Sequence, residues 1–517
     1  MRKAFVSGMS VFWLVSCRTQ TQPVTVTAGQ FGAGSGYTAS CNGDFPSWIS
    51  NNPPVADGNG DINPHEPGGQ KPFELAQDYP LGIPVFAGNT VSHYDPPAPN
   101  ADAPWRTWGN LADPAQRTSY LNALKAYILE NMSDPDIAFD ATRNNLNLNH
   151  RGWYHVPMMT AAGTRRREPY HGMTAERALR PSEQQHWLTP GADLRAFAIG
   201  YYNYLGGYTI GQVFPSSNLA QTNPTKSRFI DGALVFKLLF AEYVPARMVT
   251  GVDPLAGAPS WWVQDPANPA SPILETRLLQ VDVAVKDDHF ASTTGWVFAT
   301  FDYDQRLVST EPNAWKRLTP VGVMWGNDPS VTGASGTLTQ SWINPSLPPA
   351  FAGHLGRAGR LIGPVDDPVS SCLSCHSTAE VDPSQAGHEP QYSGAATKPP
   401  AGCSDPMDWF RNVPSGTPFG AGLVCPVNPT ASGMLSMDYS LQIQEGVASV
   451  FGFGNTNPCV GVSGAPLRYS LNVVPGSAGH RSGRDKLHYR SALNGPIPIA
   501  LKEGQPVGPT PGESLAR

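Results

Sequence analysis

The chain has 517 residues, and its 52 glycines and 52 prolines make up about a fifth of them. This fraction disfavours a helical bundle or a coiled coil, because both residues interrupt helices. Hydrophobic residues make up 40% and charged residues only 15%, so the chain can bury a sizeable core and disorder is not expected. The net charge is −6 and no basic run or stripe that could track a phosphate backbone is present, which argues against a nucleic-acid partner.

The first feature along the chain predicts export. Residues 1–16 have the pattern of a signal peptide: Arg2 and Lys3 supply positive charge, and the mostly apolar stretch that follows is too short to span a bilayer. The stretch ends in Leu-Val-Ser followed by Cys17, which resembles the bacterial lipobox. Acylation of Cys17 would anchor the chain in a membrane on the periplasmic side of the envelope. Arg18 follows in place of Asp, which favours the outer membrane.

A helix is expected after residue 113. Asp113 suits the N-cap, Pro114 suits the first helical position, and apolar residues such as Tyr120, Leu124 and Ile128 then recur at helical spacing. We interpret this helix as structural.

The pattern changes to strands from about residue 228. Apolar residues alternate with polar ones or form β-compatible runs in four segments, 233–243, 279–285, 296–303 and 318–325. The links contain turn-forming residues and no crossover helix, so an antiparallel meander is expected. One more helix is expected near 440–450.

One cysteine motif carries the strongest chemical signal. Cys372, Cys375 and His376 form a Cys-x-x-Cys-His sequence, in which two thiols one helical turn apart add to the haem vinyl groups and the histidine ligates the iron. A zinc ribbon would need a second close cysteine pair, and a thioredoxin-type site would need a strand-to-helix setting. We therefore predict one covalent haem c, with zinc or a redox disulfide as the alternatives.

Four cysteines remain after the lipidated one and the haem pair: Cys41, Cys403, Cys425 and Cys459. An even number in an oxidising compartment predicts two disulfides, and Cys403 with Cys425 is the pair closest in sequence. Free buried thiols are the alternative.

Four segments, in this order, resemble one haem family. They are Phe229-Ile-Asp-Gly-Ala-Leu-Val-Phe-Lys237, Val283-Ala-Val-Lys-Asp287, Thr294-Gly-Trp-Val-Phe298 and the haem motif. Together they resemble the pigment-460 cytochromes and their cytochrome c′-beta relatives. The resemblance implies an antiparallel sheet on one face of the haem, His376 as proximal ligand and an open distal site. It also makes Lys237 a candidate catalytic residue, since hydroxylamine-oxidising members link a lysine to the porphyrin; a solvent-facing lysine is the alternative.

The sixth iron ligand decides the mechanism. Met434 and Met437 follow His376 at a spacing found in small c-type cytochromes, although either could simply pack in the core. His354 and His388 are the other candidates. A methionine ligand predicts electron transfer, whereas an open position predicts binding of NO, peroxide or hydroxylamine.

The sequence thus predicts a β-rich α+β fold in which an antiparallel sheet packs on a covalent haem c, with irregular and helical extensions at both ends. The leading function is a membrane-anchored cytochrome that transfers electrons to or from a redox partner protein of the cell envelope. The alternatives are a pigment-460-type haem oxidoreductase or NO-binding protein, and a structural lipoprotein with haem.

The predicted regions are a signal peptide (1–16), an anchored tether and irregular segment (17–110), a helical and irregular region (111–227), the sheet with its haem site (228–385), a C-terminal extension (386–490) and a tail (491–517).

Overall fold

The computed structural model describes residues 38–42, 45–49, 79–80, 103–129, 153–156, 173–215, 222–263, 274–384, 405–423 and 433–450. Its α-helices are α1 (Pro114–Leu129), α3 (Tyr204–Val213), α4 (Cys372–His376) and α5 (Leu441–Val450). The strands are β1 (Thr38–Asn42), β2 (Phe45–Ile49), β3 (Thr174–Ala175), β4 (Ala196–Tyr202), β5 (Leu234–Glu242), β6 (Ser260–Val263), β7 (Leu274–Lys286), β8 (Trp296–Tyr303), β9 (Leu318–Met324), β10 (Ser341–Ile343), β11 (Glu380–Val381) and β12 (Leu435–Ser436).

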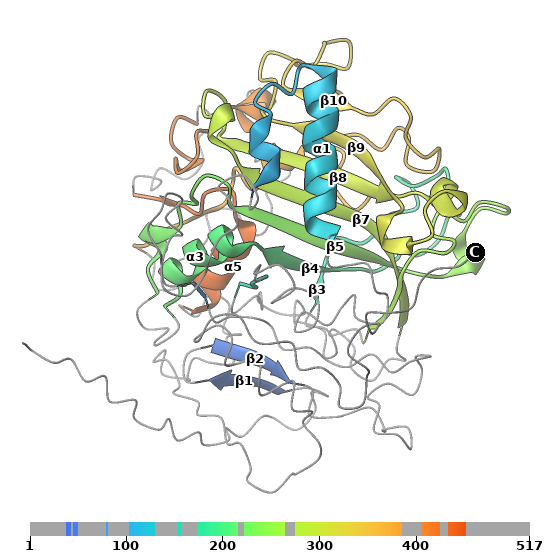
Figure 1. Ribbon diagram of the computed structural model, residues 1–517, viewed down its shortest axis with the longest axis horizontal. Coiled ribbons are helices and arrows are strands. Elements are labelled where there is room, and N and C mark those ends of the chain that lie inside the picture. The colour runs from blue at the N-terminus through green and yellow to red at the C-terminus, as the bar shows by residue number, and fades with distance from the viewer. Residues whose placement is uncertain are drawn as a thin grey trace, which may run out of the picture.

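An antiparallel sheet forms the centre of the molecule. Seven strands lie in the order β10-β9-β8-β7-β5-β4-β3, and β6 pairs with β7 beside this path. Apart from β6, strands that follow one another along the chain are neighbours in the sheet, as in a meander (Figure 1). The predicted β-rich α+β fold and its antiparallel sheet are therefore confirmed.

The helix α1 covers one face of this sheet and runs across its strands (Figure 1). Asp113 caps it, because its Oδ1 accepts a hydrogen bond from the Ala115 amide at 2.7 Å. Tyr120 and Leu124 are fully buried and belong to a core that includes Phe236 of β5 and other apolar strand residues. The helical stripe seen in the sequence is thus the contact between α1 and the sheet.

The opposite face of the sheet is covered by chain from the C-terminal half. The start of α5 reaches β4, where the Tyr202 hydroxyl and the Ser440 hydroxyl lie 2.9 Å apart. At Gly200 of β4 an added Cβ would lie 2.4 Å from the end of the Gln442 side chain, so this residue of α5 packs directly over the strand. The helix α4 and the segment before it pack near β7 to β9, as Leu361 and Leu373 share a core cluster with Ala284 and Phe298.

The sheet begins before the predicted boundary at residue 228, since β3 and β4 lie within the region expected to be helical and irregular. Every residue of β4 is buried, so its sequence shows no alternation of apolar and polar side chains. The helix α3, between β4 and β5, was also not predicted.

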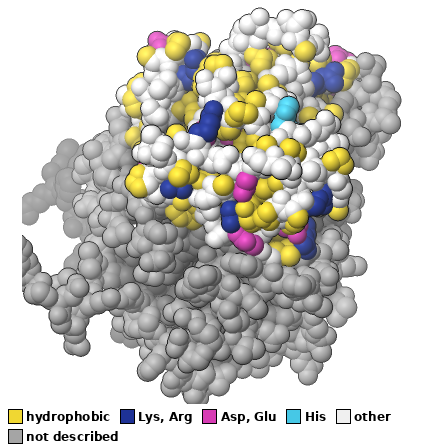
Figure 2. All heavy atoms as spheres, turned by 90° about the vertical axis from the view of Figure 1, so that its right-hand side faces the viewer, with side chains coloured by type: hydrophobic (Ala, Val, Ile, Leu, Met, Phe, Trp, Pro, Cys, Tyr) yellow, Lys and Arg dark blue, Asp and Glu magenta, His cyan; other side chains and the backbone are white. Residues whose placement is uncertain are grey.

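No helix in the described part of the chain is long and apolar enough to cross a membrane. On the described part of the face in Figure 2, Lys and Arg side chains are interspersed with acidic and uncharged ones. This part of the surface shows no broad patch of one charge.

Candidate haem-binding site

The short helix α4 carries all three residues of the haem motif. Ser371 precedes it and forms a reciprocal cap with Ser374: the Ser374 amide donates to Ser371 Oγ at 3.0 Å, and the Ser371 amide donates to Ser374 Oγ at 2.9 Å. Because this cap fixes the first turn, the helix begins at Cys372.

The two cysteines of α4 are available for attachment. Cys372 and Cys375 are three residues apart on the helix, so their side chains lie on the same side. Both are free thiols and half-buried, whereas Leu373 and Ser374 between them are fully buried. Burial raises the pKa of Cys375 to about 12 and that of Cys372 well above its usual value.

The imidazole of His376 is oriented by two contacts. Its Nδ1 lies 2.9 Å from the carbonyl oxygen of Tyr439, and its ring centroid lies 4.8 Å from that of Phe298 on β8. Burial is the main cause that lowers the pKa of His376 to about 4; the hydrogen bond to the Tyr439 carbonyl opposes it, and the positive charge of Lys237 adds to it. The ring is therefore neutral at pH 7, with Nδ1 donating and Nε2 as the nitrogen that can coordinate a metal.

The sheet presents a polar row on the same face as Phe298. Lys237 of β5 lies opposite Asp282 of β7, which lies opposite Thr300 of β8, and Thr300 is two residues from Phe298. Thr300 Oγ1 donates to Asp282 Oδ1 at 2.8 Å. Lys237 thus lies on the sheet face that also carries Phe298, whose ring contacts His376, and its positive charge contributes to the lowered pKa of His376.

Lys237 is held as a cation by an acidic partner. Its Nζ lies 2.8 Å from Glu176 Oε2 on the neighbouring segment after β3, and its side chain keeps 30% of its exposure. Burial alone would lower the pKa of Lys237, but the charge and hydrogen bond of Glu176 outweigh it and the pKa is raised. The lysine therefore does not project freely into solvent.

Three carboxyl groups lie close together near the motif. Burial, followed by the charge of Asp366, raises the pKa of Asp282, and burial also raises that of Asp366. Asp302 is 1% exposed, neither of its carboxyl oxygens has a hydrogen-bond partner among the described residues, and burial raises its pKa well above the usual range. Burial is the main cause that raises the pKa of Cys372, and the charges of Asp366 and Asp282 add to it.

Both candidate methionines are buried. Met437 is fully buried in the apolar cluster that includes Leu373 and Val381, and its amide donates to the Ala379 carbonyl at 2.7 Å. Met434 is 5% exposed and precedes β12, which pairs with β11 just after the motif. This burial favours core packing for both side chains.

The remaining sequence candidates are scattered. His354 is 9% exposed, and its Nε2 lies 3.2 Å from the Asp366 carbonyl oxygen. Cys41 lies on β1, of which only the backbone is described. The candidates outside the described residues are Cys17, His388, Cys403, Cys425 and Cys459.

These residues fit a covalently attached haem better than a bare metal ion. Within the described residues no group of three His, Cys, Asp or Glu side chains is arranged to hold a metal ion. Haem iron needs only one protein ligand besides its porphyrin nitrogens, and a neutral histidine with a bonded Nδ1 next to two free thiols meets that need.

Sequence reasoning missed the residues that support His376. Tyr439 follows the motif by 63 residues and carries no recognisable signal, and Asp438 beside it was not singled out. Ser371, three residues before Ser374, is a capping pattern that the sequence did contain.

Comparisons of the chain with family models, with curated proteins and with solved structures found no match. The site is therefore interpreted from its own residues and geometry.

Proposed function

We propose that the chain is a c-type cytochrome of the bacterial cell envelope that carries one covalent haem and transfers electrons. The observation that supports it most is the geometry of α4: two free, half-buried thiols on one side of a capped turn, followed by a neutral histidine whose Nδ1 is bonded to a carbonyl. In this proposal Cys372 and Cys375 form the thioether links and His376 is the proximal ligand. The bound haem would supply one-electron redox chemistry.

The protein residues would hold and tune this group. The Tyr439 carbonyl fixes the His376 ring and makes Nε2 the coordinating atom, while Phe298 limits rotation of the ring. The sheet residues Lys237 and Asp282 would supply buried charge beside the motif. Membrane attachment through Cys17, a position on the periplasmic side of the outer membrane and a redox partner protein of the envelope belong to the same proposal.

A pyridine haemochrome spectrum of the full chain, expressed with a cytochrome c maturation system, tests the proposal. We expect a c-type band and haem that stays with the polypeptide on denaturation. Replacing both Cys372 and Cys375 by Ala should abolish covalent haem, whereas Cys459→Ser removes a thiol outside the motif and should retain it. A wild-type chain without a c-type band would refute the proposal.

A second function is favoured by one specific observation, the burial of Met434 and Met437, of which Met437 packs in the apolar cluster of Leu373 and Val381. An iron without a methionine ligand would be open to NO or another small nitrogen or oxygen species, as in the pigment-460 type of oxidoreductase. Spectra of the reduced protein with and without CO separate the two functions. Rapid CO binding by a high-spin iron would support the second, and an inert low-spin spectrum would support the electron carrier.

A further inference from the structure

Two consecutive residues beside the haem motif have an unusual backbone. Asp438 and Tyr439 have φ angles of 47° and 69°, in the left-handed region that disfavours residues with a side chain. Tyrosine is an especially poor residue for this conformation. Such a turn persists only where its surroundings hold it in place, and it is found preferentially at functional sites.

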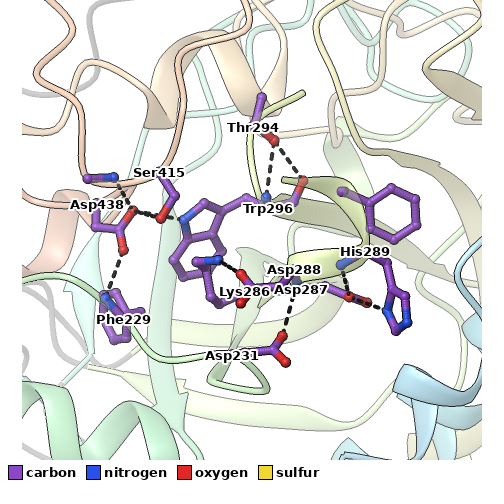
Figure 3. A network of polar contacts seen from close by, with 12 residues as sticks. Phe229, Asp231, Lys286, Asp287, Asp288, His289, Thr294, Trp296, Ser415 and Asp438 are labelled. Carbon is purple, nitrogen blue, oxygen red and sulfur yellow. Dashed lines mark hydrogen bonds and ion pairs between the residues drawn. The ribbon is translucent and has the colours of Figure 1, made fainter. Parts of the chain in front are cut away.

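The carboxylate of Asp438 is what holds this turn (Figure 3). Its Oδ2 accepts from the Phe229 amide at 2.7 Å, and its Oδ1 accepts from Trp296 Nε1 at 3.1 Å. The same Oδ1 also accepts from Ser415 Oγ at 2.8 Å and from the Gly416 amide at 3.0 Å. Asp438 is fully buried, so these four donors replace the water that a buried carboxylate loses.

The donors come from three separate parts of the chain. Phe229 precedes β5, Trp296 begins β8, and Ser415 lies in the segment that follows the motif. The Ser415 amide also donates to the Thr294 carbonyl at 2.9 Å, which ties this segment to the turn before β8. The Asp438 carboxylate therefore ties the Asp438–Tyr439 turn to the ends of the sheet strands.

The turn presents one carbonyl to the haem motif. The Tyr439 carbonyl oxygen lies 2.9 Å from His376 Nδ1, and the Tyr439 hydroxyl donates to the Val413 carbonyl at 2.5 Å. The tyrosine ring also lies against those of Trp296 and Phe298. A small rotation of this peptide would move the oxygen out of line with the imidazole.

We propose that Asp438 is a positioning residue for His376: its carboxylate holds the left-handed Asp438–Tyr439 turn so that the Tyr439 carbonyl polarises the axial imidazole. This inference rests on the proposed haem attachment and extends it. Asp438, which lies 62 residues after His376 in the C-terminal extension, would thereby help to set the reduction potential of the iron. A stronger Nδ1–H···O bond makes the imidazole a better donor, which stabilises ferric over ferrous iron.

The test measures the reduction potential of the full-length holoprotein in Asp438→Ala, Asp438→Asn and Ser415→Ala. Asp438→Ala should raise the potential by about 59 mV, equivalent to a tenfold change in the equilibrium constant of this one-electron couple. Asp438→Asn keeps one acceptor and tolerates the left-handed backbone, so it should shift the potential less. Ser415→Ala removes a single donor and should give the smallest shift in the same direction.

The control is Asp253→Ala, which removes a carboxylate that accepts from the Tyr243 hydroxyl and the Leu255 amide, outside the haem motif and the Asp438–Tyr439 turn. It should leave the potential unchanged. A shift as large as that of Asp438→Ala would overturn the inference, since the loss of an unrelated hydrogen-bonded carboxylate would then have the same effect. If Asp438→Ala does not fold, Asp438→Asn and Ser415→Ala decide the test.

Two failures can be told apart. A wild-type chain without a c-type haemochrome band refutes the haem proposal itself. A wild-type chain with that band, and variants that melt earlier but keep the wild-type potential, refutes only the role of Asp438.

Discussion

The two faces of the central sheet are built by alternate residues of the same strands, yet they differ in kind. On the α1 face, Phe236 of β5 lies opposite Val283 of β7, and both are 1% exposed within the apolar core. One position along each strand, Lys237 lies opposite Asp282 on the other face. A single pattern of pairing therefore produces an apolar core on one side and, on the other, a row of polar residues flanked by two apolar clusters.

The difference matters because the second face is also covered. Burying charge costs free energy unless partners compensate it, and Asp302 on this face has no hydrogen-bond partner among the described residues. The chain that covers this face carries the haem motif, and Phe298 contacts His376 directly. Buried titratable groups that cluster beside such a motif are characteristic of a functional site. We infer that the α1 face stabilises the fold and the opposite face serves the haem.

The largest effect should come from the α1 face. Phe236 packs at 4.8 Å edge-to-face with Trp153 and at 4.9 Å with Tyr201, measured between ring centroids. Phe236→Ala leaves a cavity and should lower the free energy of unfolding by about 3–5 kcal/mol. Denaturant unfolding measures this loss, and the haem spectrum of the folded variant should stay unchanged.

The matched change on the other face is Thr300→Val, which keeps the shape and removes the hydrogen bond to Asp282. It should cost only about 1 kcal/mol of stability and should shift the reduction potential. If Phe236→Ala altered the haem spectrum while Thr300→Val left both potential and spectrum intact, the assignment of roles to the two faces would be wrong.

A smaller effect concerns pH. Burial, followed by the charges of Asp282 and Asp366, raises the pKa of Asp302 above the unfolded value of about 3.9. The folded state then binds more protons, so the stability that Asp302 contributes is present at low pH and is lost as pH rises through the folded pKa. Asp302→Asn should therefore raise the melting temperature by a few degrees at pH 8 and change it little at pH 4.

Asp304, two residues after Asp302, serves as the control, because its pKa is lowered whereas that of Asp302 is raised. Burial would raise its pKa, but hydrogen bonds from Arg306 and Thr319 outweigh this and lower the pKa. Its contribution is present above the unfolded value and is lost as pH falls, so Asp304→Asn should destabilise the protein at pH 8. Melting curves from pH 4 to pH 9 compare the two variants, and parallel curves for both would contradict the buried-carboxyl interpretation of Asp302.

The fold was predictable where the composition of a strand is clear. Alternation of apolar and polar residues predicted β7, and the predicted limits of β8, residues 296–303, match the structure. Both β4 and β8 are buried at every residue, but β8 is rich in aromatic and β-branched residues, whereas β4 contains Gly200 and two alanines. Because glycine and alanine are not typical of strands, β4 was missed.

The candidate site was predictable only in its motif residues. Cys372, Cys375 and His376 lie within five consecutive positions, so their spacing alone identified them. The contact of His376 with Tyr439 depends on a turn that has no local signature, because Tyr439 adopts a left-handed backbone that its residue type disfavours. Such a contact depends on hydrogen bonds between distant segments, and these leave no periodic pattern in the sequence.

The smallest effect concerns the two buried methionines that follow the motif. Met437 is fully buried in a cluster with Leu373 and Val381, so Met437→Leu conserves volume and should cost less than about 1.5 kcal/mol. The oxidised and reduced spectra should stay the same, because Met437 packs in the apolar core. Met434→Leu is the control at a neighbouring buried position. Conversion of a low-spin spectrum to a high-spin, CO-binding one in Met437→Leu alone would instead identify Met437 as the sixth ligand.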